Sequence, residues 1–239
     1  MPANRIKLDP ALERRYARKA QRRKSRQIVC KILIVCEGTK TEPNYFEAFK
    51  TFNGGTIVYD IDVRGLGQNT TDVVDKAIEL KSKGDYDRVW AVFDKDSFSA
   101  NKFNGAIIKA QNNGIGCAWS NEAFELWYLY HFMNRVTAMS RTEYKQAISE
   151  AVNNSLQYKN RKVYEYAKND KDNYRIMTTY GSIENAIRFA EAKSRDYTDQ
   201  RYATHNPCTM VFKLVRQLIG RDEELNEELN NELTNKIEK

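Results

Sequence analysis

The stretch ILIVCEGTKTEPNYFEAFK, residues 32–50, leads from an apolar run through a glutamate and a glycine into a polar segment. Its first five residues complete the run IVCKILIVC at residues 28–36, which is rich in β-branched side chains. A nearly continuous apolar run is typical of a strand buried on both faces of a parallel sheet. Pro43 suits the first turn of a helix. The stretch therefore predicts a strand–turn–helix unit with Glu37 at the turn.

Strands and helices continue to alternate after this unit. Further strands are expected at 56–63, 88–96 and 115–120, with helices at 41–52, 71–84 and 99–114. Strands that alternate with helices of this length imply right-handed βαβ units and a doubly wound sheet. After residue 121 the pattern becomes helical, with helices expected at 121–133, 140–154, 182–198 and 207–220.

These patterns predict an α/β fold, with a mainly parallel four-stranded sheet followed by a helical C-terminal region. The chain is expected to divide into a basic N-terminal arm at 1–28, an α/β domain at 29–135 and a helical region at 136–239. The last region ends in an acidic helix whose leucines recur every four residues, which indicates one apolar stripe. That stripe packs either on its own domain or on a partner.

The basic residues are concentrated at the N-terminus. The formal net charge is +7, yet residues 1–31 alone carry eleven Lys and Arg against two acids. Such an arm can lie along a phosphate backbone and gain affinity by releasing counterions. The alternative is a solvated tail that binds a partner protein or nothing. The candidate nucleic-acid contacts are Arg14, Arg15, Arg18, Lys19, Arg22, Arg23, Lys24 and Arg26.

Composition excludes several classes of protein. At 239 residues with 41% hydrophobic and 30% charged residues, the chain suits a globular protein with a full core. It has no apolar run of about 18 residues that could span a membrane, and no apolar secretion signal. The four cysteines form no CxxC pair and are expected to be reduced core residues of a cytoplasmic protein. Both histidines, His131 and His205, are expected to be structural.

Acidic residues follow two of the predicted strands. Glu37 ends the first strand, and Asp94 and Asp96 end the third, with strand alternation turning both aspartates the same way. Ligands of open α/β sheets sit beyond the carboxyl ends of the strands. Clustered carboxylates usually hold a cation or have raised pKa values. Oxygen ligands of this kind suit Mg²⁺ or Mn²⁺; the alternative is a helix cap and a surface charge.

The strand–Glu–Gly and strand–DxD pair resembles a Toprim domain, the metal-binding module of topoisomerases, primases and OLD-type nucleases. Four segments, ILIVCEGTKTEPNYFEAF, VWAVFDKDSF, SNEAFELWYLYHF and NPCTMVFKLVRQLI, resemble the RloB family in order and spacing, over about residues 10–219. The resemblance implies a Toprim-like core, a place in anti-phage defence and an ABC-type ATPase partner. It leaves a homo-oligomer open.

The resemblance also implies roles for individual residues. Lys40, in the loop after Glu37, would contact a scissile phosphate or be a plain surface lysine. Asn121 and Glu122 fit a helix cap. The residues that would form the metal site are Glu37, Glu42, Asp94, Asp96 and Glu125.

Three functions follow from these residues. The first is a Mg²⁺-dependent nuclease acting on DNA, RNA or tRNA, in which the carboxylates hold one or two metal ions. The second is a non-cleaving subunit that binds metal or nucleic acid and reports to an ATPase, since the chain has no Walker A loop of its own. The third is a metal-free structural subunit.

Overall fold

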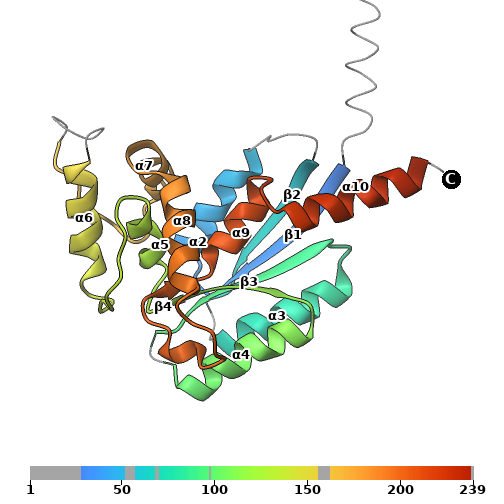
Figure 1. Ribbon diagram of the computed structural model, residues 1–239, viewed down its shortest axis with the longest axis horizontal. Coiled ribbons are helices and arrows are strands. Elements are labelled where there is room, and N and C mark those ends of the chain that lie inside the picture. Colours follow the sequence, from blue (N-terminus) through green and yellow to red (C-terminus); the bar gives the residue numbers. More distant parts are fainter. Residues whose placement is uncertain (1–27, 52–56, 68–69, 97, 156–161, 238–239) are drawn as a thin grey trace, which may run out of the picture.

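The computed structural model describes residues 28–51, 57–67, 70–96, 98–155 and 162–237 (Figure 1). The eight candidate nucleic-acid contacts of the basic arm lie outside the described residues.

A five-stranded sheet, ordered β2-β1-β3-β4-β5, forms the centre of the protein. Neighbouring strands among the first four are parallel, and the last strand runs antiparallel to β4. The predicted α/β fold is therefore confirmed. The strands are β1 (Ile28–Cys36), β2 (Ile57–Gly65), β3 (Arg88–Asp94), β4 (Gly116–Asn121) and β5 (Cys208–Thr209).

The predicted count of four strands is wrong, because β5 adds a fifth. The helix expected from residue 207 begins only at Val211, as α9 (Val211–Leu218). Before it, the chain pairs with the end of β4, and the hydroxyls of Ser120 and Thr209 share a buried hydrogen bond of 2.9 Å. The C-terminal part of the chain thus returns to the same sheet.

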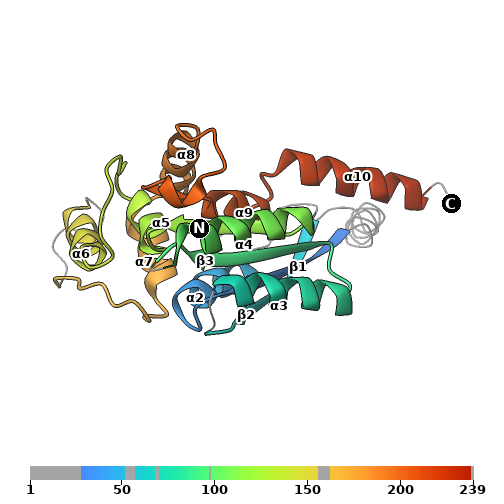
Figure 2. The same cartoon turned by 90° about the horizontal axis from the view of Figure 1, so that it is seen from below.

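Strand alternation divides the core into two apolar layers. Leu33 and Val35 of β1 face helices α3 (Thr70–Lys83) and α4 (Ala100–Asn112), which lie together on one face of the sheet (Figures 1 and 2). Ile32, Ile34 and Cys36 face the opposite layer, which includes buried residues of α2 (Thr41–Glu47), α5 (Glu125–Tyr130) and α9. The apolar run of β1 is therefore buried on both sides, as predicted.

The helical region differs from its prediction in detail. The helix expected at 121–133 is the short α5, since Asn121 still belongs to β4. The first two leucines of the acidic tail, Leu225 and Leu229, are buried against the core, so this part of the tail packs on its own domain. The remaining helices are α6 (Tyr144–Asn154), α7 (Asn173–Tyr180), α8 (Ile183–Ser194) and α10 (Glu223–Ile237).

All four cysteines are free thiols, and three of them are buried. Within the part of the chain that the structure describes, no helix has the length and apolar character needed to cross a membrane.

Candidate active site: an acidic cleft at the carboxyl edge of the sheet

The ends of β1 and β3 meet, as the sequence predicts. The backbone N–H of Glu37 donates to the carbonyl of Val92 at 2.9 Å, which extends the pairing of β1 with β3 by one residue. The side chain of Glu37 then turns toward β3, where its Oε2 accepts a hydrogen bond from the backbone N–H of Asp94 at 3.1 Å. The first-strand glutamate and the first aspartate of the DxD motif are therefore neighbours.

A cleft of about 270 Å³ opens at this edge of the sheet. It combines four carboxylates with three basic side chains, so it suits a ligand that carries both a cation and an anion. Its described lining is Glu37, Gly38, Thr39, Lys40, Thr41, Glu42, Gly67, Asp94, Asp96, Arg141, Lys168 and Asn169.

The glycine after Glu37 leaves room for the next acid. Glu42 lies in the first turn of α2 and is only 5% exposed. A Cβ added to Gly38 would lie 2.3 Å from Oε2 of Glu42, closer than any side chain tolerates. Gly67 closes the loop from the β2 side with a φ of +62° and donates its N–H to the carbonyl of Glu37 at 2.8 Å.

Burial raises the pKa values of three carboxylates of the cleft, and neighbouring acids add to the effect. Burial raises the pKa of Glu37 to about 7, and the charges of Glu42 and Asp96 add to the effect. Burial and then the carboxylates of Glu42, Glu125 and Glu37 raise the pKa of Asp94 well above its usual range. The pKa of Glu42 is raised chiefly by burial, with Glu125 contributing. Acids arranged in this way are stabilised by a bound cation.

Asp96 reaches the cleft by a different route from the predicted one. Strand β3 ends at Asp94, and Asp96 has a left-handed backbone with a φ of 36°. Strand alternation therefore does not extend to it, and a turn directs its side chain instead. There its carboxylate forms an ion pair with the guanidinium of Arg141. Lys95 between the two aspartates donates to the carbonyl of Phe98 and does not line the cleft.

Glu125 lies close to the cleft acids without lining the cleft. It is 5% exposed, and its Oε1 accepts a hydrogen bond from the hydroxyl of Tyr166 at 3.2 Å. The ammonium of Lys168 lies 3.8 Å from the same oxygen. Its other oxygen, Oε2, is buried and has no hydrogen-bond partner among the described residues. An orphaned carboxylate oxygen of this kind is suited to a metal ligand.

Sequence reasoning missed two basic residues of the site, Arg141 and Lys168. Arg141 lies in the turn before α6, where the sequence predicts a helix, and Lys168 lies in the loop before α7, so only their docking reveals them. The predicted helix cap at Glu122 is also wrong, because α5 begins at Glu125 without a side-chain cap. Glu122 accepts a hydrogen bond from the backbone N–H of Arg141 at 3.0 Å and so anchors that loop.

The carboxylates match a hard divalent cation in kind, since they offer only oxygen ligands. As the side chains stand, no group of three or more His, Cys, Asp and Glu residues in the described segments could hold a metal ion. Two of the acids contact cations instead, Asp96 at Arg141 and Glu125 at Lys168. The donor set therefore fits Mg²⁺ or Mn²⁺ in kind, and its carboxylates would have to move closer together to coordinate one.

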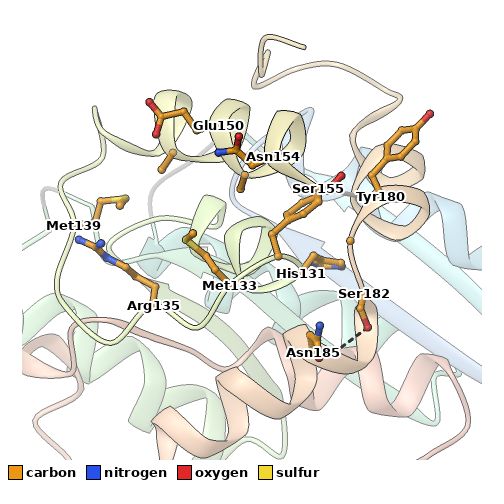
Figure 3. Close-up of a pocket in the computed structure, with 14 residues that line it drawn as sticks. His131, Met133, Arg135, Met139, Glu150, Asn154, Ser155, Tyr180, Ser182 and Asn185 are labelled. Carbon is orange, nitrogen blue, oxygen red and sulfur yellow. Dashed lines mark hydrogen bonds between the residues drawn. The ribbon is translucent and has the colours of Figure 1, made fainter. Parts of the chain in front are cut away.

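A larger cavity, of about 660 Å³, lies elsewhere, beside α6 and the segment that follows α5 (Figure 3). Met133 and Met139 give it an apolar wall, and Glu150 is the single carboxylate among its described lining residues. His131 is buried at its edge, where Nδ1 bonds to the carbonyl of Trp127 at 3.0 Å. The larger cavity therefore lacks the cluster of acids that lines the cleft.

Fold and site together define an α/β protein with an acidic cleft at the carboxyl edge of a mostly parallel sheet. The family model described as RloB-like protein matches residues 32–218, and the chain belongs to the RloB-like family. No curated protein and no solved structure matches the chain.

Proposed function

We propose that the acidic cleft is the active site of a Mg²⁺-dependent nuclease of the Toprim type, acting on DNA, RNA or tRNA. The observation that carries this proposal is the meeting of Glu37, Glu42 and Asp94 at one edge of the sheet, where burial and then the charges of neighbouring carboxylates raise their pKa values. Cations bound by such carboxylates are the usual means of phosphodiester hydrolysis.

The residues of the cleft have different proposed roles in binding metal and phosphate. Glu37, Glu42 and Asp94 would bind the first ion, and Asp96 and Glu125 would complete its shell or bind a second. A divalent cation held there would polarise the attacking water and the phosphate. Lys40 lines the cleft at the start of α2 and would contact the phosphate. The basic arm would grip the nucleic-acid backbone outside the cleft.

A second candidate is a non-cleaving subunit that binds metal or nucleic acid and reports to an ABC-type ATPase. The ion pairs of Asp96 and Glu125 favour it, because a cleft neutralised by its own cations is stable without a metal. In either case we propose that the protein is cytoplasmic and acts in anti-phage defence. We also propose that it works with an ABC-type ATPase partner, as a monomer or as a homo-oligomer.

A cleavage assay separates the two candidates. Purified protein is incubated with plasmid DNA, single-stranded DNA and total tRNA, each with Mg²⁺, Mn²⁺ or EDTA. The nuclease proposal expects cutting that EDTA abolishes and that the Glu37→Ala and Asp94→Ala proteins lack. The decisive negative result is a folded protein, in complex with its ATPase partner, that cuts none of these substrates with any cation. That result would favour the non-cleaving subunit.

A further inference from the structure

Two of the five predicted metal ligands are held by cations from the helical region. Arg141 pairs with Asp96, and Lys168 lies 3.8 Å from Glu125. Both cations line the acidic cleft. Their side chains are 38% and 43% exposed, so each can meet a ligand in the cleft while it contacts its acid.

The backbone under each cation is fixed by the surrounding fold. The N–H of Arg141 donates to Glu122, as described above. The carbonyl of Lys168 accepts a hydrogen bond from Oγ1 of Thr41 at 2.9 Å, which ties its loop to the start of α2. The side chain of Asn44 adds a second, longer bond of 3.4 Å to the carbonyl of Asn169. The two cations are thus placed over the cleft by the fold, although their charged ends remain accessible.

A divalent metal on either oxygen of a carboxylate neutralises the charge with which a side-chain cation pairs, and the unpartnered Oε2 of Glu125 is such an oxygen. When a metal takes up Asp96 and Glu125, the charges of Arg141 and Lys168 lose their partners beside a half-buried cleft. A phosphate group is the anion that suits them, because guanidinium binds phosphate through paired hydrogen bonds and an ammonium binds it as a point charge.

We propose that Arg141 and Lys168 are the phosphate-binding residues of the cleft, and that each exchanges its carboxylate for a backbone phosphate when a divalent cation binds. The inference rests on the proposed function, because it takes the carboxylates as metal ligands and a nucleic acid as substrate. Metal and nucleic acid must each strengthen the binding of the other, since coupling between two ligands is reciprocal.

The test uses Arg141→Gln and Lys168→Gln in the full chain. Their matched controls are Arg135→Gln and Lys171→Gln. Arg135 bonds to the carbonyl of Thr137 at 3.0 Å and lines the larger cavity, and Lys171 is exposed in the same loop as Lys168 without lining the cleft. Mn²⁺ binding is followed by electron paramagnetic resonance. Binding of a short fluorescein-labelled single strand, as DNA and as RNA, is followed with Ca²⁺ over a series of salt concentrations.

The proposal expects opposite changes in the two measurements. Mn²⁺ should bind about three- to fivefold more tightly to each cleft variant, the effect of removing one partly exposed ion pair. The single strand should bind more weakly, and the slope of log K against log salt should fall by about 0.7 for each residue replaced, the value for one lost phosphate contact. The control variants should match the wild type in both.

Unchanged Mn²⁺ affinity with an unchanged salt slope would overturn the proposal, and so would equal changes in the control variants. The result is independent of cleavage. If Mn²⁺ affinity rises and the salt slope falls in a protein that cuts nothing, the exchange of partners is supported and the nuclease proposal is wrong. If the protein cuts in a metal-dependent way without these changes, the nuclease proposal is supported and the exchange is wrong. If Mn²⁺ binds no variant, the metal site fails, and the salt slopes alone decide whether the two cations contact phosphate.

Discussion

The acidic cleft and the cavity beside His131 differ in size and in the cause of the pKa shifts of their residues. The cleft is the smaller, at about 270 against 660 Å³, yet its carboxylates raise one another's pKa. In the cavity, burial alone lowers the pKa of His131 to about 4, and its neighbours are the rings of Tyr45 and Trp127. Burial is the largest cause in both places, but in the cleft like charges add to it, and that addition indicates a site that a cation stabilises. A shift caused by burial alone is typical of a core position.

The substitution Asp94→Asn should have the largest effect on cleavage. It removes a buried carboxylate at the end of β3, beside Glu37 at the end of β1. We expect cleavage to fall about 1000-fold or more, as when a principal transition-state contact is lost. The free energy of unfolding should stay the same or rise, since the change also removes a repelling charge. Initial cleavage rates and urea denaturation measure the two effects.

The control is Asp60→Asn on β2, which makes the same chemical change at an exposed position. It should leave the cleavage rate unchanged. A large loss of stability in Asp94→Asn would contradict the account, because it would make this aspartate a structural residue.

His131, which lines the cavity, should make the stability of the protein depend on pH. The folded pKa of His131 is lowered to about 4 from an unfolded value of about 6.5, so its contribution to stability is complete above pH 6.5 and is lost as the pH falls toward 4. The loss should reach about 3 kcal/mol. His131→Phe should remove this part of the acid sensitivity, as measured by urea unfolding from pH 7 to pH 4. Equal pH dependence in the two proteins would show that folding does not shift the pKa of His131.

Tyr166→Phe tests the carboxylate behind the cleft. Loss of its hydroxyl removes the 3.2 Å hydrogen bond to Glu125 and should cost about 1.5 kcal/mol of stability. If Glu125 binds the metal, added Mg²⁺ should reduce this cost. Tyr164→Phe is the matched control, because its hydroxyl bonds to Asn173 at 3.1 Å, and its cost should not respond to Mg²⁺. The same Mg²⁺ response in both variants would exclude Glu125 as a ligand.

Gly38→Ala should have the smallest effect on the fold and a selective effect on the cleft. The new methyl group would displace the carboxylate of Glu42, whose oxygen lies 2.3 Å from the position of the added Cβ. We expect Mn²⁺ affinity to fall roughly threefold to tenfold while stability changes by less than about 1 kcal/mol. Isothermal titration and thermal unfolding measure the two. Unchanged Mn²⁺ affinity would mean that Glu42 is not a ligand.

The part of the site that could be predicted is the part that lies on strong local patterns. The apolar run of β1 and the run of β3 each end in acids, and parallel strands bring such ends to one edge. The placement of Glu37 beside Asp94 therefore follows from the sequence. The position of Asp96 does not, because a left-handed residue in a turn, and not strand alternation, directs its side chain.

The parts of the site and fold that could not be predicted depend on contacts between segments far apart in the sequence. Arg141 lies in the turn before α6, within the helix expected at 140–154, and Lys168 lies in a loop before α7; each meets an acid far away in the chain. Strand β5 has two residues, too few to show an alternation, and forms because Thr209 pairs with Ser120 across the edge of β4. Helix α7 was not predicted either. In each case the decisive contact joins segments that local propensity treats separately.

The most direct test of the account is the position of a bound metal. Crystals grown or soaked with Mn²⁺ would be measured at a wavelength where manganese scatters anomalously. We expect an anomalous peak at ligand distance from Asp94 and from Glu37 or Glu42, with Arg141 turned away from Asp96. A protein that binds Mn²⁺ only elsewhere, or not at all, with the pair of Arg141 and Asp96 intact, would contradict it.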